Sequence, residues 1–209
     1  AIKEKNLQIF NPCTGVKLPK LDNARERYLS INEINLLRDT VKQTNDKSLY
    51  IFLELLLQTG ARKFSILTLT KKDFNLEHKE VTLKNHKTNT TYKGFLQEDF
   101  IEPLKEHLKQ FNLNEHIFTF SDDMMYSLVG HKLLNILDKL FNVGLASNDR
   151  KNKVVIHTLR HTYASHLAIN GIPIFTIQKL MNHSDITQTM RYAKLSPENG
   201  KLAIQGLYK

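Results

Sequence analysis

The stretch LYIFLELLLQTG, at residues 49–60, constrains the possible folds more than any other part of this sequence. It is apolar on nearly every side of a helix, so other elements must cover that helix all round in the centre of a domain. Gly60 suits the C-terminal cap, where a left-handed backbone is common. The run contains Glu54 and is shorter than the roughly 18 apolar residues that indicate a membrane span. It therefore predicts a buried central helix and gives no sign of a membrane contact.

The sequence around this central helix predicts a mainly helical domain. Ser30 followed by Glu33 forms a capping box at a helix start, and apolar residues recur on one face after it. Two segments rich in Thr, Val and Tyr, 80–84 and 90–96, predict strands joined by the turn NHKTNT. Helical patterns recur at 61–69, 98–111 and 127–141, from about 157 to NGIP, and from about 174 to NHSD. The expected fold class is mainly α with a small antiparallel β-sheet, an α+β domain.

The N-terminal segment and the single cysteine bear on organisation and location. NPCTGVKLPK carries two prolines, a glycine and lysines, which predicts an extended linker over residues 1–27. We expect residues 28–209 to form one domain and an upstream domain to be absent from this chain. Cys13 is the single cysteine, which excludes a disulfide framework and a cysteine-rich zinc site. The N-terminus has no apolar signal-peptide core, so the expected location is the cytoplasm.

The charge balance favours an anionic partner. Lys plus Arg number 30 against 21 Asp plus Glu, a formal net charge of +9. The isoelectric point is about 9.5. Nucleic acid is the first candidate for such a surface, although solvated lysine-rich faces give the same balance without any partner.

The stretch HTLRHTYASHLAINGIPIFTIQKLMNHSDITQTMRY contains the candidate site, and its histidines have three interpretations. His157 and His161 are four apart on a helix, so both could bind one metal ion. The metalloprotease pattern also needs a Glu between them, and here Arg160 stands there instead. A cation beside a cation-binding pair is unfavourable, so no metal site is expected.

The second interpretation is structural. His161, Tyr163 and His166 belong to an amphipathic helix whose apolar face includes Leu159 and Leu167. For His161 and His166 we favour this interpretation, because a histidine on such a helix is usually a core residue with satisfied hydrogen bonds.

The third interpretation is a phosphate site. His157 and Arg160 are three apart and project from one helical face, and a guanidinium can bind two phosphate oxygens at once. Arg62 follows Gly60 at the start of the next helix, where free backbone N–H groups favour an anion. An apolar segment on each side of Arg62 predicts that it lies over the core.

These residues together resemble the catalytic domain of the tyrosine recombinases, the family of phage integrases and Xer-type resolvases. The resemblance covers residues 28 to about 195, and the family's motifs stand here in order as TGAR, NHKTNT, HTLR, LMNH and MRY. The last two place Tyr192 nine residues after His183. The resemblance implies six catalytic residues: Arg62, Lys87, His157, Arg160, His183 and Tyr192.

Two positions depart from the family pattern, and one assignment has alternatives. The family usually has an acidic residue three after the first arginine, where this chain has Ser65, so Arg62 is expected to be held less firmly. Asn182 replaces the usual glycine before the second histidine and tolerates the same backbone. Lys84 and Lys93 lie in the same hairpin as Lys87 and are alternatives to it.

The resemblance implies a site-specific DNA recombinase or integrase that cleaves and rejoins DNA through a covalent 3′-phosphotyrosyl intermediate. Tyr192 would attack the phosphodiester, and Arg62 and Arg160 would neutralise its oxygens. His157 would act as base for the tyrosine or orient it, and His183 would hydrogen-bond the phosphate. Lys87 would protonate the leaving 5′-oxygen. No cofactor and no metal ion are expected.

Other functions and partners remain open on the sequence alone. The same chemistry serves type IB topoisomerases, which relax DNA, and a non-catalytic DNA-binding regulator could keep the fold. The expected partner is double-stranded DNA, and the resemblance implies a homo-oligomer on DNA, a tetrameric synapse. It also implies that KLAIQGLY, at 201–208, packs as a short helix on a neighbouring protomer.

Overall fold

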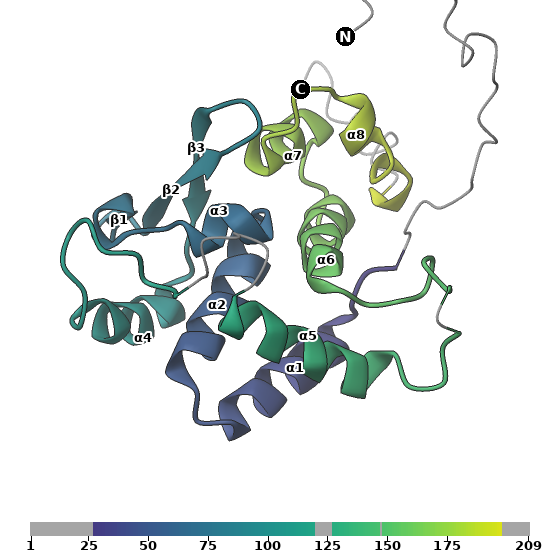
Figure 1. Ribbon diagram of the computed structural model, residues 1–209. Coiled ribbons are helices and arrows are strands. Elements are labelled where there is room, and N and C mark those ends of the chain that lie inside the picture. Colours follow the sequence, from purple (N-terminus) through teal and green to yellow (C-terminus); the bar gives the residue numbers. More distant parts are fainter. Residues whose placement is uncertain (1–26, 120–126, 147, 198–209) are drawn as a thin grey trace, which may run out of the picture.

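The computed structural model describes residues 27–119, 127–146 and 148–197 (Figure 1). The predicted linker, apart from Arg27, and the segment 201–208 lie outside these residues. The α-helices are α1 (Ile31–Gln43), α2 (Lys47–Thr59), α3 (Lys63–Leu67), α4 (Glu98–Leu108), α5 (Leu128–Phe141), α6 (Ile156–Ile169), α7 (Ile174–Met181) and α8 (Thr187–Met190). The strands and 3-10 turns are η1 (Lys71–Asp73), β1 (Phe74–Asn75), β2 (Glu80–Asn85), β3 (Thr90–Phe95) and η2 (Ala193–Leu195).

Helix α2 forms the centre of the domain, as its composition predicts. Its residues from Leu49 to Leu57 are buried except Tyr50. Helices α1, α4, α5 and α6 all pack against it (Figure 1). Each large apolar side chain that is fully buried contributes about 1.5–3 kcal/mol, so this helix supplies much of the hydrophobic stabilisation. Gly60 ends α2 in the left-handed conformation, with φ 59°.

One charged residue within α2 is buried together with its counter-ion. Glu54 is 2% exposed and accepts two hydrogen bonds from the Arg38 guanidinium of α1, at 2.7 and 2.8 Å. Gln58 Nε2 donates to the same carboxylate at 3.0 Å. A buried carboxylate is tolerated when it is paired and hydrogen-bonded in this way. The pair therefore fixes α1 against α2 without leaving an unmatched charge in the core.

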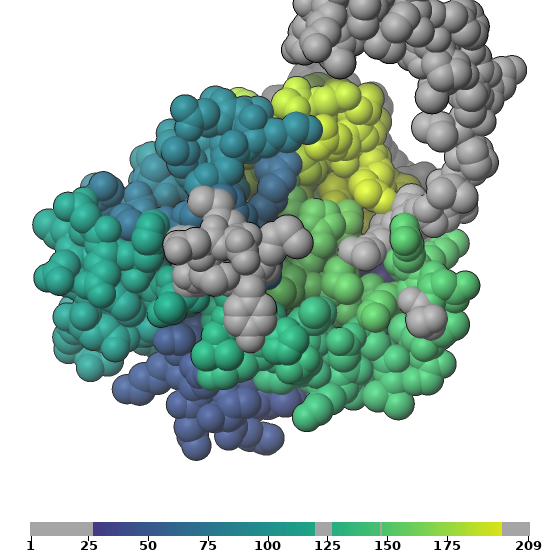
Figure 2. All heavy atoms as spheres, in the orientation of Figure 1, coloured from purple at the N-terminus to yellow at the C-terminus, as the bar shows by residue number. Residues whose placement is uncertain are grey.

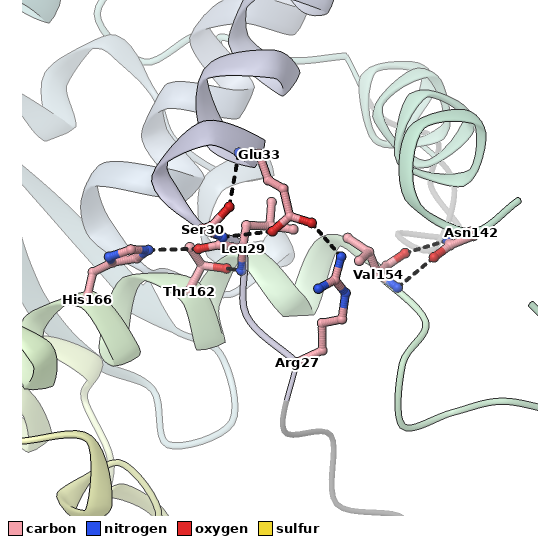
Figure 3. Close-up of polar contacts among 8 residues, drawn as sticks. All are labelled: Arg27, Leu29, Ser30, Glu33, Asn142, Val154, Thr162 and His166. Carbon is pink, nitrogen blue, oxygen red and sulfur yellow. Dashed lines mark hydrogen bonds and ion pairs between the residues drawn. The ribbon is translucent and has the colours of Figure 1, made fainter.

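The chain enters the domain along α6, as Figure 3 shows. The backbone N–H of Leu29 donates to Thr162 Oγ1 at 3.0 Å, and the Leu29 carbonyl accepts from His166 Nε2 at 2.8 Å. The capping box of Ser30 and Glu33 then starts α1, as predicted. His166 thus has the structural role that the helical pattern indicates. The start of α1 is thereby fixed to the helix that carries His157 and Arg160.

A three-stranded antiparallel sheet of order β1-β2-β3 lies beside α3 (Figure 1). The hairpin of β2 and β3 confirms the two predicted strands, with Leu83 opposite Tyr92. Strand β1 was not predicted, because two residues are too few to give an alternating pattern. The mainly α fold class with a small antiparallel sheet is confirmed. In the described part of the chain, no helix is long and apolar enough to cross a membrane.

Candidate active site

A cleft of about 850 Å³ brings most of the predicted site residues together. The described residues that line it include five of the six implied by the resemblance: Arg62, His157, Arg160, His183 and Tyr192. They come from the start of α3, from α6, and from the segment around α8. In Figure 2 the blue to teal atoms of the β2–β3 hairpin lie next to the yellow atoms of the segment around α8. Lys87 is not among the residues that line the cleft.

Arg160 is the best-fixed cation of the cleft. It is 3% exposed, and its guanidinium donates to two backbone carbonyls, those of Gly60 at 2.7 Å and Met181 at 2.5 Å. Burial, and then the neighbouring Arg62, lower the pKa of Arg160 to about 10, so it stays charged at neutral pH. These two bonds orient the guanidinium before any ligand arrives.

Arg62 supplies a hydrogen-bond donor with no partner. It is the N-cap residue of α3 and is half-buried. Its Nη1 atom is buried and, among the described residues, has no acceptor. An unpaired N–H of a charged group in a buried position is unfavourable, and an oxygen of a bound anion would satisfy it. The open donor of Arg62, with the charge of Arg160 near it, is an arrangement that suits an anion.

His183 is held beside the arginines by a left-handed residue. Asn182 caps α7 at φ 47° and ψ 51°, the conformation expected of the residue that replaces glycine there. His183 Nδ1 lies 2.8 Å from the buried Thr189 Oγ1. Burial, followed by the charges of Arg160 and Arg62, lowers the pKa of His183 to about 4. The ring is therefore neutral at pH 7. A threonine hydroxyl can donate or accept, so this contact fits either tautomer, and the tautomer that accepts at Nδ1 carries its proton on Nε2.

Tyr192 is buried against α6 and α7, and its hydroxyl has a histidine partner. The residue is 5% exposed and packs in a cluster with Ala164 and Met181. Its hydroxyl oxygen lies 2.7 Å from His161 Nδ1. Burial raises the pKa of Tyr192, while the positive charges of Arg191 and Arg160 act in the opposite direction. A phenol in this position stays protonated at neutral pH unless a base takes its proton.

His161 is the site residue that sequence reasoning missed. We expected it to be a core residue, and it is indeed buried, at 9% exposure, but it lines the cleft and contacts Tyr192. The exposed His157 packs edge-on against it, with ring centroids 4.8 Å apart and planes at 88°. The signal was the four-residue spacing, which places both rings on one face of α6. His157, His161 and Tyr192 thus form a row.

The hairpin holds Lys87 in its turn. Lys87 is exposed, and its backbone N–H donates to Asn85 Oδ1 at 3.1 Å. Lys84 lies on the exposed side of the hairpin, while the neighbouring Leu83 is buried on the other. Lys93 pairs with Glu80 at 2.5 Å. Of these three lysines, Lys87 stands in the turn between β2 and β3, while Lys84 and Lys93 lie on the strands themselves.

Three contacts anchor the hairpin to α3 and its C-cap residue Thr68. Ser65, where the family pattern has an acidic residue, donates its hydroxyl to the Lys84 carbonyl at 2.7 Å. His86 packs on the Phe64 ring at 4.3 Å, and its Nε2 lies 2.9 Å from Thr68 Oγ1. Ser65 thus connects α3 to strand β2. The family pattern has an acidic residue at this position, and a serine supplies no carboxylate.

Comparison with known proteins identifies the family. Residues 27–199 match the phage integrase family. The chain belongs to this family. It is 28% identical over 189 residues to the tyrosine recombinase XerA of Saccharolobus solfataricus, covering 90% of this chain and 59% of the relative. It is 26% identical over 192 residues to XerC of Staphylococcus aureus, covering 90% and 63%. The integrase chain therefore spans roughly three fifths of the length of these curated relatives.

Solved structures of family members share the fold. The catalytic domain of bacteriophage HP1 integrase superimposes with a TM-score of 0.61 at 21% identity, covering 86% of this chain and 94% of that one. The XerA recombinase crystal structure gives 0.63 at 20% identity, with 89% and 66% covered. The Tn1549 transposon integrase in complex with transposon right end DNA gives 0.68 at 17% identity, with 100% and 75% covered. The expected tyrosine recombinase catalytic-domain fold is confirmed.

Proposed function

We propose that this chain catalyses site-specific DNA recombination, cleaving and rejoining DNA through a covalent 3′-phosphotyrosyl intermediate at Tyr192. The observation that carries the proposal is the convergence of a buried tyrosine, two arginines and a neutral histidine on one cleft. One Arg62 nitrogen, which has no acceptor among the residues that the structure describes, favours an anion there. A DNA phosphodiester supplies this anion, and the tyrosine is the nucleophile that can attack it.

The residues of the cleft divide the reaction among them. Tyr192 Oη forms a bond to phosphorus while the bond from phosphorus to the 5′-oxygen breaks, so the 3′-phosphate stays on the enzyme. Arg62 and Arg160 neutralise the two non-bridging oxygens, whose charge increases in the transition state. Neutral His183 donates from Nε2 to the same phosphate. Because the phosphotyrosyl bond conserves the energy of the broken bond, the reverse attack by a 5′-hydroxyl rejoins the strand without ATP.

Lys87 completes the reaction as the general acid. The 5′-oxygen leaves as an alkoxide unless it is protonated, and a lysine ammonium is a suitable donor. We place this role on Lys87 because it stands in the turn between β2 and β3, anchored through Asn85 and His86. Bound DNA would draw the turn toward the cleft, since its phosphates attract the exposed cation.

Double-stranded DNA is the proposed partner, and a homo-oligomer on DNA, a tetrameric synapse, is the proposed assembly. The formal charge of +9 favours a polyanion. Solved structures of two similar proteins contain DNA: XerH bound to its difH substrate, and the Tn1549 integrase in complex with transposon right end DNA. Exchange of strands between two duplexes separates a recombinase from a topoisomerase, which rejoins the strand it cut. The proposed place of action is the cytoplasm.

The test is capture of the covalent intermediate. A nicked suicide duplex loses the short 5′-hydroxyl fragment after cleavage, so the phosphotyrosyl adduct accumulates. A library of such duplexes with randomised sequence removes the need to know the cognate site, and sequencing the DNA of the adduct reveals it. We expect an adduct in excess chelator, mapped by mass spectrometry to Tyr192 and absent from Tyr192→Phe.

Tyr163→Phe is the matched control, because Tyr163 is a partly buried tyrosine of the neighbouring helix α6. It should form the adduct like the wild type. An adduct that persists in Tyr192→Phe, or one that forms only with Mg²⁺, would contradict the proposed function.

A further inference from the structure

The contact between His161 and Tyr192 carries a more specific inference, which rests on the proposed function. The Tyr192 hydroxyl lies 2.7 Å from His161 Nδ1, although the two residues are 31 apart in the sequence. Both side chains are at least nine-tenths buried, with 5% of Tyr192 and 9% of His161 exposed. Water is therefore a poor acceptor for the phenolic proton here. His161 Nδ1 is within hydrogen-bond distance of the hydroxyl and is a nitrogen to which the phenolic proton can move.

We propose that His161, rather than His157, takes the phenolic proton as Tyr192 attacks DNA and returns it when the strand is rejoined. His161 is then a catalytic residue, because it touches the reacting hydroxyl. His157, exposed at the cleft and edge-on to His161, acts as a positioning residue that fixes the imidazole of its neighbour. The spacing of four residues on α6 keeps the two rings in contact.

Cleavage then involves two proton transfers and one exchange of bonds at phosphorus. The Tyr192 O–H bond breaks, its proton moves to His161 Nδ1, and the oxygen's electron pair forms the bond to phosphorus. The bond from phosphorus to the 5′-oxygen breaks, and that oxygen takes a proton from Lys87. His161 ends as a cation and Lys87 as a neutral amine. In rejoining, Lys87 takes the proton of the attacking 5′-hydroxyl and His161 returns its proton to Tyr192.

The proposal requires one tautomer of His161. To accept a proton at Nδ1, the neutral ring must carry its hydrogen on Nε2, so that Tyr192 donates to Nδ1. With the opposite tautomer, Nδ1–H would donate to the phenol oxygen and His161 would only orient it. The tautomer therefore separates a base from a structural hydrogen bond.

The first experiment reads this tautomer in the free protein, without DNA. The imidazole of His161 is assigned by ¹⁵N NMR, using His161→Asn to identify its signals. We expect a non-protonated Nδ1 whose shift changes in Tyr192→Phe, where the donor is lost. A proton on Nδ1, or a His161 signal that is indifferent to Tyr192→Phe, would overturn the proposal.

The second experiment tests the base role during cleavage. His161→Asn keeps an amide near the Nδ1 position that can accept a hydrogen bond but cannot take a proton. We expect adduct formation to slow by about 100- to 10,000-fold, the usual contribution of general base catalysis, with DNA affinity unchanged. Replacing Tyr192 by a fluorinated tyrosine, a more acidic phenol, should then restore much of the rate, because the missing base matters less.

The matched control is His157→Asn, one helical turn away on α6. Its adduct rate should not recover selectively with the fluorinated tyrosine, because a positioning residue is not replaced by a more acidic nucleophile. Selective recovery in His157→Asn, or a wild-type rate in His161→Asn, would refute the assignment. His161→Gln provides a second variant if His161→Asn does not fold.

The two proposals fail differently. If the wild type forms no phosphotyrosyl adduct on any duplex of the library, the proposed function fails. If the wild type forms the adduct and the His161 variants form it equally fast, the recombinase function stands and the role of His161 fails.

Discussion

The guanidinium of Arg160 donates to the carbonyl oxygen of Gly60, 100 residues earlier in the chain, at 2.7 Å. Gly60 ends the buried central helix in a left-handed conformation, with φ 59°. The residue that terminates the core helix is thus also an acceptor that orients a site arginine. The end of the core helix and the orientation of Arg160 in the cleft are linked at this one position.

Gly60→Ala should lower both the stability of the fold and the rate of DNA cleavage. A Cβ atom at Gly60 would lie 2.3 Å from Tyr163 Cδ1, and the left-handed backbone adds its own strain. We expect a loss of about 2–5 kcal/mol in the free energy of unfolding, from backbone strain of about 1–2 and overpacking of about 1–3 kcal/mol. Adduct formation should fall as well, because the acceptor for Arg160 moves. Chemical denaturation and the suicide-duplex assay measure the two effects.

Gly144→Ala is the control for this change. Gly144 also has positive φ, 80°, but a Cβ there meets nothing within 4 Å. Its free energy of unfolding should fall only by the backbone strain of about 1–2 kcal/mol, and it should cleave DNA like the wild type. Equal losses in the two variants would show that the Tyr163 contact has no energetic weight.

Arg160→Lys should separate binding from cleavage. A lysine keeps the charge but cannot donate to the Gly60 and Met181 carbonyls as a fixed planar group while it meets a phosphate. We expect cleavage to fall by about 100- to 1,000-fold, the usual cost of one lost transition-state donor. DNA affinity should change little, because the charge remains. Gel-shift titration and single-turnover cleavage are the measurements, and parallel losses in both would contradict this view of Arg160.

Much of the fold follows from local patterns in the sequence. The apolar run ending at Gly60, the capping box at Ser30 and the strand pair of 80–84 and 90–96 depend on neighbours in sequence, and all appear where expected. Helix α8 and strand β1 escaped prediction, because four and two residues are too short to show a period.

The sequence predicted which residues line the cleft better than it predicted the contacts between them. The motifs identified five side chains that line one cleft. The contact of His161 with Tyr192 was missed, because it depends on how the chain turns back at Asn182 after α7. No local pattern encodes a tertiary contact between residues 31 apart. The replacement of the acidic residue by Ser65 likewise gained meaning only from its bond to the Lys84 carbonyl.

Acid should destabilise the protein partly through His183. Its pKa is about 4 in the folded chain against 6.5 for the ordinary side chain, because burial and then Arg160 disfavour the charged form. The unfolded chain therefore binds more protons between these values, and stability falls as pH drops from about 6.5 to about 4. His107 and His86, whose pKa values burial also lowers, act with the same sign.

The measurement is the free energy of unfolding across that pH range. His183→Asn should lose less stability on acidification than the wild type. His78 is exposed, so His78→Asn should show the same pH dependence of stability as the wild type. A pH dependence that is unchanged in His183→Asn would show that the ring is not held neutral by its surroundings.

Lys87→Ala should show a defect that depends on the leaving group. If Lys87 protonates the 5′-oxygen, its loss slows cleavage of ordinary DNA by about 100- to 10,000-fold. A substrate with sulfur at the 5′-bridging position needs no protonation, since a thiolate is a good leaving group, so this variant should cleave it nearly as fast as the wild type. Lys84→Ala is the control, because Lys84 lies on the exposed side of the same hairpin. It should cleave both substrates like the wild type. If the sulfur substrate restores cleavage in Lys84→Ala and not in Lys87→Ala, Lys84 is the general acid. If Lys87→Ala cleaves both substrates slowly, Lys87 acts in DNA binding and not as the acid.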